Sequence, residues 1–402
     1  MGELSSIEQA AVERAGASPM LQQVLAWSAV NSGSRNLAGL ARMADLLGDA
    51  FADLPGALAL EAPAEVDSVD AGGRTLSIEH GRHLHLAVRP DAPVQLLLTG
   101  HMDTVFAPDH PFQATSWIEP DAVLGGPGVA DMKGGIAVML AALKAVEASP
   151  AAVRIGYEVV INSDEEVGSL SSAALLARAA RGKRAALTYE PAALPDGTLA
   201  GARPGSGNFA LIVRGRSAHA GRNPEDGRNA VLAAADLALR LDAAKHEGLR
   251  INPSRIEGGS PGNVVPDLAI LRVNLRPTTP GDEDAAREMI AALVRDIAAK
   301  HDVEIETHGG FGRPPKPLTP EAEALFALVR SAGADLGQTI GWQPSGGVCD
   351  GNNIAACGVP VVDTMGVRGG KIHSAEEYLI VDSLSERAAL SALTILRLAE
   401  GA

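Results

Sequence analysis

Short apolar runs alternate with helical periodicity through the first half of the chain. The run 94–99 (VQLLLT) is almost continuously apolar, which is typical of a strand buried on both faces. Similar runs at 159–161 and 185–188 predict two more buried strands. A helix is expected after Gly135, where apolar residues return at helical spacing: Ile136, Leu140, Leu143 and Val146. Strands that alternate with helices predict a mostly parallel sheet with helices on its faces.

The pattern changes near Leu199. The segment 201–207 is rich in glycine and proline, and we expect it to cross between two domains. The following segments predict, in order, a strand at 209–213, a helix at 229–243, strands at 250–257 and 268–275, a helix from near Glu283 and a strand at 303–306. This β-α-β-β-α-β order is that of a ferredoxin-like α+β unit.

The pattern of the first half then returns. The segment 309–320 (GGFGRPPKPLTP) resembles a linker, and it precedes a helix from Glu321 and a strand at 360–363. We therefore expect an α/β fold in which a mixed, mostly parallel sheet flanked by helices forms a catalytic domain. That domain would consist of two pieces, 1–200 and 313–402, with the ferredoxin-like unit inserted between them at 201–312.

Length and charge agree with this organisation and exclude some partners. The chain has 402 residues, more than one ordinary hydrophobic core holds, and 46% of them are hydrophobic, which excludes a disordered protein. Asp and Glu number 49 against 34 for Lys and Arg, for a net charge of -15. Because such a chain repels phosphate backbones, we expect no nucleic-acid partner. An anionic small substrate stays open, since a few converging cationic side chains reverse the field locally.

Cysteine content and the absence of targeting segments indicate the compartment. The chain has two cysteines, Cys349 and Cys357, too few for a secreted disulfide scaffold. Residues 1–20 lack the basic and apolar regions of a signal peptide, and no apolar stretch is long enough to span a bilayer. We expect a cytoplasmic protein with no membrane partner.

Polar clusters follow the apolar strands, where open α/β sheets place their ligands. They lie at 100–103 (GHMD), 130–135 (ADMKGG), 163–166 (SDEE) and 189–191 (YEP), with a fifth at 372–374 (IHS). Together they offer two imidazoles and several carboxylates, a ligand set that suits Zn²⁺. Two cations balance this much buried carboxylate better than one. A shared carboxylate would hold them about 3.5–4 Å apart, the spacing that activates water and polarises a carbonyl together.

Each cluster taken alone has a plainer interpretation. A single pair such as His101 and Asp103 is more often a surface or core pair than a metal site, and Glu165 with Glu166 more often starts a solvated helix. The recurrence of clusters at strand ends reverses that preference. His101 and Asp103 point the same way on an extended strand end, so Asp103 is placed to accept the second N–H of His101 and fix its tautomer.

Seven segments spread along the chain carry a closer resemblance: TGHMDTVF, GPGVADMKGGIA, NSDEEVGS, TYEP, RGRSAHAG, GNVVPD and KIHSAEEY. In this order they resemble the M20 family of zinc metallopeptidases, especially its glutamate carboxypeptidase (carboxypeptidase G2-like) branch. The resemblance implies two Zn²⁺ ions per subunit, although carboxylate-rich sites also accept Mn²⁺ or Co²⁺. It assigns His101 and Glu190 to one zinc, Glu166 and His373 to the other, and Asp131 to both. It also implies a non-proline cis peptide bond after Asp131.

The family pattern also implies roles beyond the metal ligands. Glu165 would be the general base that moves a proton from the metal-held water to the leaving nitrogen. His219, in the inserted domain, would reach the active site of a partner subunit and stabilise the oxyanion, which implies a homodimer through that domain. A surface histidine at a turn is the plainer interpretation of His219.

Asn263 and Arg276 are implied substrate contacts, the arginine through paired hydrogen bonds to a carboxylate. Arg276 has a plainer interpretation too, as an edge-strand arginine in a solvent ion pair. Asn274 stands where many relatives carry an acid, so the chain departs from the family pattern two residues before Arg276. The stretch 345–353 (SGGVCDGNN) would wall the pocket, with Gly347 allowing close backbone approach.

Other residues of this region keep two interpretations. Asp350 would orient either a ligand or the loop, and Cys349 is not needed as a nucleophile. Arg368 and Lys371 either attract an anionic substrate or are simply solvated, and solvation is the plainer interpretation.

Three functions follow for comparison. The first is a di-zinc exopeptidase of the carboxypeptidase type, releasing a C-terminal residue, with Asp or Glu among the candidates, from short peptides or N-acyl amino acids. The second is an N-acyl amino acid deacylase of the acetylornithine or succinyl-diaminopimelate type, which would share every metal ligand. The third, a metal-binding protein without turnover, is disfavoured because neither the base nor any ligand is missing.

Overall fold

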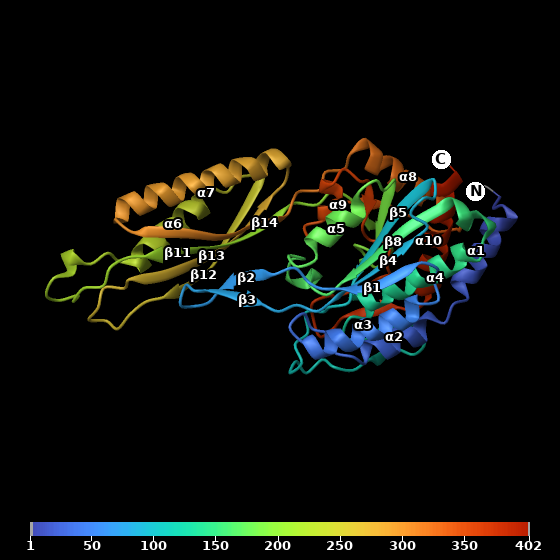
Figure 1. The fold of residues 1–402 in the computed structure, drawn as a ribbon, viewed down its shortest axis with the longest axis horizontal. Coiled ribbons are helices and arrows are strands. Elements are labelled where there is room, and N and C mark those ends of the chain that lie inside the picture. Colours follow the sequence, from blue (N-terminus) through green and yellow to red (C-terminus); the bar gives the residue numbers. More distant parts are fainter. Residues whose placement is uncertain (1–2, 401–402) are drawn as a thin grey trace.

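The computed structural model describes residues 3–400, so residues 1–2 and 401–402 of the expected catalytic pieces lie outside the described range. A larger and a smaller body lie end to end (Figure 1). The central sheet of the larger body has the order β1-β4-β8-β5-β9-β16. Its strands are β1 (Ala57–Glu61), β4 (His83–Val88), β5 (Val94–His101), β8 (Ile155–Asn162), β9 (Ala185–Thr188) and β16 (Val361–Val362). β5, β8, β9 and β16 are parallel, and β4 and β1 add antiparallel strands at one edge.

Helices cover both faces of this sheet, as the apolar runs predict. One face carries α1 (Ser6–Gly16), α2 (Met20–Ser28), α3 (Leu37–Phe51), α4 (Gly135–Glu147), α8 (Pro320–Asp335) and α10 (Asp382–Glu400). The other face carries α5 (Ala173–Ala180) and α9 (Asp350–Ala356). Along β5, Leu96 and Leu98 pack against the first group and Leu97 against the second. Alternate residues of one strand thus enter opposite layers, which explains the continuous apolar run.

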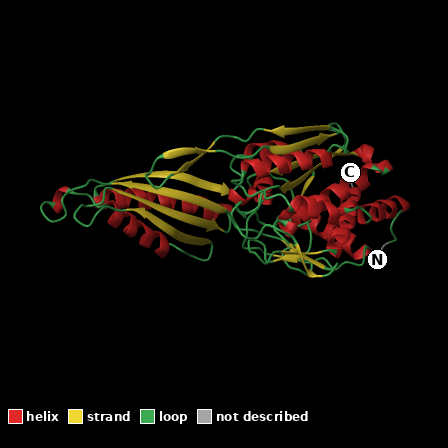
Figure 2. Ribbon diagram, turned by 90° about the horizontal axis from the view of Figure 1, so that it is seen from below, coloured by secondary structure: helices red, strands yellow, loops and turns green. Residues whose placement is uncertain are grey.

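The smaller body is the predicted ferredoxin-like unit. It contains β11 (Ser206–Arg214), α6 (Ala230–Ala243), β12 (Leu249–Gly258), β13 (Leu268–Pro277), α7 (Pro280–His301) and β14 (Glu304–Arg313). The strands form an antiparallel sheet of order β12-β13-β11-β14, and both helices pack on one face of it (Figure 2). Thr279 caps α7 with a capping box, and the helix begins at Pro280, three residues before the predicted start at Glu283. The predicted fold class, a mostly parallel α/β sheet with an inserted α+β unit, is confirmed.

The linker prediction for 309–320 was wrong over its first residues. Strand β14 continues to Arg313, with Gly309 opposite Phe209 and Gly310 opposite Asn208. A side chain at Gly309 would begin 2.2 Å from the carbonyl oxygen of Asn208, and its φ of 90° also favours glycine. These glycines serve close strand pairing, although in the sequence they look like a loop.

A hairpin from the larger body reaches the open face of the small sheet. It consists of β2 (Val66–Val69) and β3 (Thr75–Ile78). Val69 packs in a small cluster with Ala210 and Ile212 of β11. The Arg272 guanidinium donates to the Val69 carbonyl at 2.7 Å, which fastens the hairpin to the sheet. The hairpin was not predicted.

The remaining strands are short. One sheet has the order β17-β18-β7-β6, with β6 (Ser116–Glu119), β7 (Val123–Gly125), β17 (Gly369–Gly370) and β18 (Tyr378–Ile380). A pair is formed by β10 (Leu199–Ala200) and β15 (Trp342–Gln343). Cys349 and Cys357 are both free thiols. Within residues 3–400, none of the helices combines the length and apolar character needed to cross a membrane.

The two-faced burial of β5 gives a stability test. Replacing the fully buried Leu98 with alanine removes packing on the α4 side and should lower the free energy of unfolding of the larger body by about 2–5 kcal/mol. Val153→Ala, at a side chain that is 74% exposed, should change it by less than about 0.5 kcal/mol. Denaturant unfolding of both variants is the measurement, and equal losses would contradict this account of the core.

Candidate active site

Histidines and carboxylates gather at the carboxyl end of the parallel strands. His101 is the last residue of β5, Glu165 and Glu166 lie in the turn after β8, and Glu190 follows β9. Asp131 belongs to the irregular turn 129–134 that leads into α4. His373 comes from a loop after β17 and has a positive φ of 62°. The parallel topology therefore brings together residues that are far apart in the sequence.

The Asp131 carboxylate lies between the two histidines. One of its oxygens, Oδ1, is 3.1 Å from His101 Nε2, and the other, Oδ2, is 3.3 Å from His373 Nε2. Glu190 lies on the His101 side at 3.7 Å, and Glu166 on the His373 side at 3.0 Å. The arrangement therefore has two halves, each with one imidazole and one carboxylate, and Asp131 is shared.

Asp103 fixes both His101 and the two adjacent acids. The Nδ1 of His101 is 3.0 Å from the backbone carbonyl of Asp103 and 3.4 Å from its carboxylate, both acceptors, so Nδ1 carries the proton. The Nε2 atom then faces the carboxylates of Asp131 and Glu190. The Asp103 carboxylate accepts the backbone N–H groups of Glu165 and Glu166, each at 3.2 Å. One side chain thus sets the tautomer of the histidine and the position of the acids.

Glu377 holds the turn that carries Asp131 in place. This buried carboxylate accepts the backbone N–H groups of Gly128, Ala130 and Asp131. The peptide bond after Asp131 is cis, as the family resemblance implies. Glu377 therefore positions Asp131 through the backbone.

Burial makes the acids of this cluster unusually weak. It raises the pKa of Glu165 to about 7 and that of Glu166 to about 8, and it also raises the pKa of Glu190. Burial likewise opposes the charged form of Asp131, but hydrogen bonds from His101 and His373 outweigh it and lower its pKa. The acids are buried and repel one another, so cations are the partners that would stabilise their charged forms.

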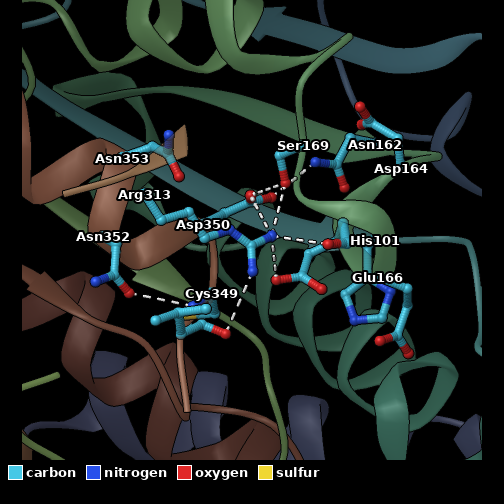
Figure 3. Close-up of polar contacts among 12 residues, drawn as sticks. His101, Asn162, Asp164, Glu166, Ser169, Arg313, Cys349, Asp350, Asn352 and Asn353 are labelled. Atoms are coloured by element: carbon cyan, nitrogen blue, oxygen red, sulfur yellow. Dashed lines mark hydrogen bonds and ion pairs between the residues drawn. The ribbon is translucent and has the colours of Figure 1, made fainter. Parts of the chain in front are cut away.

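An arginine from the small body closes the site from the other side (Figure 3). Arg313, the last residue of β14, places Nη2 2.7 Å from Oε1 of Glu165 and donates to the Glu165 carbonyl at 2.8 Å and to Ser169 Oγ at 2.9 Å. Asp350 lies 3.6 Å from the same nitrogen and accepts from Asn162 at 2.7 Å. Burial raises the pKa of Asp350 to about 7, with Arg313 opposing the shift. Asp350 therefore orients the arginine and its loop.

A cavity of about 870 Å³ lies between the two bodies. Glu165, Glu166 and His373 line one end, and residues of the small sheet, including Arg276, line the other. Gly347 borders this cavity and a second one of about 560 Å³ that reaches Asp131 and Glu190. The Arg276 guanidinium donates to the Gly346 carbonyl at 3.0 Å, so it links the small sheet to the expected pocket wall.

Two of the sequence-predicted residues are not brought to this site. Within residues 3–400, neither His219 nor Asn263 lines either cavity. They lie on adjacent loops of the small body, where the Ala220 N–H donates to the Asn263 carbonyl. The Nδ1 of the exposed His219 accepts the N–H groups of Gly221 and Arg222, so the ring proton is on Nε2, which has no hydrogen-bond partner within residues 3–400.

Three other residues have structural partners. Arg368 pairs with Glu386 at 2.9 Å, and Lys371, which lines the second cavity, pairs with Glu376 at 2.9 Å. Burial raises the pKa of Cys349 well above its usual value, so the thiol stays protonated beside Asp363.

Sequence reasoning missed Arg313 and Glu377. Arg313 stands in the segment interpreted as a linker, and only its contact with Glu165, 148 positions earlier, reveals its role. Glu377 lies inside the KIHSAEEY segment, but nothing in that segment indicates that its carboxylate accepts backbone N–H groups near Asp131.

An imidazole and carboxylate cluster at the carboxyl end of a parallel α/β sheet, with ligand atoms of His101, Asp131 and Glu166 within 4.8 Å of one another, is typical of a metal-dependent hydrolase. Residues 97–397 match the model of Peptidase family M20/M25/M40, and the chain belongs to this family. The chain is therefore a hydrolase of the metallopeptidase and amidohydrolase type.

Known relatives cover most of the chain. It is 32% identical over 317 residues to carboxypeptidase G2 of Pseudomonas sp., spanning 76% of this chain and 74% of that protein. It is 27% identical over 344 residues to succinyl-diaminopimelate desuccinylase of Psychrobacter arcticus, spanning 79% and 82%. Among solved structures, aminopeptidase PepT of Bacillus cereus has the same fold, with a TM-score of 0.71 at 22% identity over 96% of this chain and 99% of that one.

The buried Arg313 should be a large contributor to stability. Arg313→Met leaves Glu165 and Asp350 without their cation and should lower the free energy of unfolding by about 3–5 kcal/mol at pH 8. The loss should shrink at pH 5, where both carboxyl groups, with a pKa of about 7, are protonated.

Arg368→Met is the matched control, because the pair with Glu386 is partly exposed and should be worth only about 0–1 kcal/mol. Denaturant unfolding of the metal-free protein at both pH values measures the difference. If the two variants lost the same stability, Arg313 would not be the compensating charge.

Proposed function

We propose that this chain is a di-zinc hydrolase that cleaves an amide or peptide bond. His101 and Glu190 would hold one cation, Glu166 and His373 the other, and Asp131 would bridge them. The observation that carries the proposal is the Asp131 carboxylate, whose two oxygens each face a different histidine at 3.1 and 3.3 Å. A carboxylate that only paired with one histidine would not need this symmetrical placement.

The donor set fits two divalent cations. It contains two imidazole nitrogens and the carboxylates of Asp131, Glu166 and Glu190, a nitrogen and oxygen set that suits Zn²⁺ and also accepts Mn²⁺ or Co²⁺. When bound, such ions supply Lewis-acid activation of water and polarisation of the scissile carbonyl. His101 is 1% exposed at its side chain and His373 is 53% exposed, so the His373 half is the accessible one.

Glu165 has the position of the general base. One of its oxygens lies within 4.8 Å of ligand atoms of His101 and Glu190, yet the metal halves are complete without it. Its backbone is fixed by Asp103, and its carboxylate is oriented by Arg313. In the reaction Glu165 would accept a proton from the attacking water and donate it to the leaving nitrogen.

The first candidate is a carboxypeptidase-like exopeptidase. Arg276 on the cavity wall supports it, because its guanidinium suits the carboxylate of a released C-terminal amino acid, with Asp or Glu among the candidates. The resemblance to carboxypeptidase G2 agrees with this candidate. The similarity to succinyl-diaminopimelate desuccinylase supports the alternative, an N-acyl amino acid deacylase with the same metal ligands.

Separating the base from the ligand beside it tests the mechanism. Glu165→Gln should keep both zinc ions and lower kcat by about 10²–10⁴-fold, because the proton acceptor is lost. Glu166→Gln should lose zinc from the His373 half. Zinc content by mass spectrometry and turnover on a panel of dipeptides and N-acyl amino acids are the measurements, and the preferred class identifies peptidase or deacylase. Near-normal turnover by Glu165→Gln would show that Glu165 is not the general base.

We further propose a homodimer through the inserted domain, 201–312, with His219 acting at the partner's site. Leu232 and Leu239 are seven positions apart on one face of α6 and are 60% and 72% exposed. Strand β12 is an edge of the small sheet and exposes Ile256. An apolar helix face beside an open sheet edge suits a symmetric contact. The free Nε2–H of His219 suits an oxyanion.

Mixing two inactive variants tests the role in trans. His219→Ala and Glu165→Gln should each be inactive alone. In a mixed dimer one site has Glu165 from one subunit and His219 from the other, so random reassortment should restore about a quarter of wild-type activity. Activity after joint refolding or subunit exchange is the measurement. A mixture that stays inactive, although mixed dimers form, would show that His219 does not act across the interface.

The cytoplasmic location stays a prediction. The two free thiols, of which Cys357 is exposed, agree with a reducing compartment.

A further inference from the structure

A row of three asparagines crosses the small sheet on the face turned away from α6 and α7. Asn252 of β12, Asn274 of β13 and Asn208 of β11 are direct cross-strand partners. All three line the cavity of about 870 Å³ whose other end holds Glu165 and His373. Beside the row, Arg276 is the charged side chain that the small sheet offers to this cavity, within the described residues 3–400 and apart from Arg313 at its rim.

Hydrogen bonds fix the orientation of two of these amides. Arg276 Nε is 3.0 Å from the oxygen of the Asn274 side chain, and an arginine is only a donor, so the Asn274 atom facing it must be the oxygen. The nitrogen of Asn274 must then face the other way, where it donates to Oδ1 of Asn208 at 2.9 Å and to Ser206 Oγ at 3.1 Å. The order of donors therefore runs from Arg276 through Asn274 to Asn208.

As a consequence, this wall of the cavity presents hydrogen-bond donors. Asn208 uses its oxygen to accept from Asn274, and within residues 3–400 its Nδ2 donates to no protein group. Arg276 donates from Nε to the Asn274 side chain and from Nη1 to the Gly346 carbonyl. None of the described carboxylates pairs with Arg276, so its Nη2 is also available as a donor. Two neighbouring sets of N–H groups thus face the same space.

We propose that Asn274 and Asn208 determine substrate specificity by presenting the Asn208 amide N–H groups to a second acceptor on the substrate. Arg276 takes the terminal carboxylate, and Asn208 takes a side-chain carboxylate or amide carbonyl of the same residue. The inference rests on the proposed function and deepens it, because it favours acceptor-bearing side chains such as those of Glu and Gln over apolar or cationic ones.

An acid at position 274 would reverse this polarity. A carboxylate there would accept from Arg276 and also from Asn208, which would turn the Asn208 amide and present its oxygen to the cavity. It would also neutralise Arg276. The asparagine at 274 is therefore what keeps both donors directed at the substrate.

The test compares two dipeptides, alanyl-glutamate and alanyl-norvaline, which differ only in the second acceptor. Zinc-loaded wild type should prefer alanyl-glutamate in kcat/KM. Asn208→Leu should lower that preference by about tenfold or more, the value of a hydrogen bond to a charged group. Asn274→Asp should also lower the preference for alanyl-glutamate. It should weaken the binding of both dipeptides as well, because the added carboxylate neutralises Arg276.

Asn229→Asp is the control, because it adds the same charge to the small body, lines neither main cavity and keeps an N-cap for α6. It should leave the preference unchanged. If Asn208→Leu and Asn274→Asp also left the preference unchanged, the proposal would be overturned.

Calorimetric titration of free L-glutamate and L-norvaline separates this inference from the proposed function. If neither dipeptides nor N-acyl amino acids are hydrolysed, the proposed function fails, but tighter glutamate binding by the wild type that is lost in Asn208→Leu still supports the donor wall. Equal binding of the two amino acids by the wild type would overturn it whatever the turnover.

Discussion

Burial of several carboxylates at the end of β5, β8 and β9 is the constraint on which the rest of the structure depends. An ionised carboxylate without water or a partner is expensive, so each acid requires its own compensation. Asp131 has two histidines, Glu377 has three backbone N–H groups, and Glu165 has Arg313. Glu166 and Glu190 have only partial compensation from the protein, and burial keeps their pKa values high. The unbalanced charge lies where we propose that two cations bind.

The same constraint connects the two bodies. Arg313 ends the last strand of the small sheet and reaches Glu165 of the larger body. Behind it, the two chain segments that join the bodies pair through the backbones of Arg203 and Lys316, and both side chains meet the buried Asp363, at 2.7 and 3.1 Å. The position of the small sheet, and with it the asparagine row of the cavity wall, is therefore tied to the chemistry of the acids.

Much of this could be predicted from local sequence, because burial and periodicity act locally. The run 94–99, the helix after Gly135 and the order of elements in the inserted unit all follow from pattern. Arg313 could not be predicted, because its role depends on a contact across 148 positions. Strand β14 was partly missed because Gly309 and Gly310 permit close pairing while resembling a loop. The family resemblance implies a role for His219 at an active site. Within residues 3–400, however, His219 does not line the cavities of its own chain.

We propose that Asp131 bridges two cations. Anomalous diffraction at the zinc edge from crystals of the zinc-loaded protein tests it most directly. Two peaks about 3.5–4 Å apart, one beside His101 and Glu190 and one beside Glu166 and His373, with Asp131 between them, are the expected result. A single peak at full zinc loading, or two peaks with Asp131 bound to neither, would contradict the account.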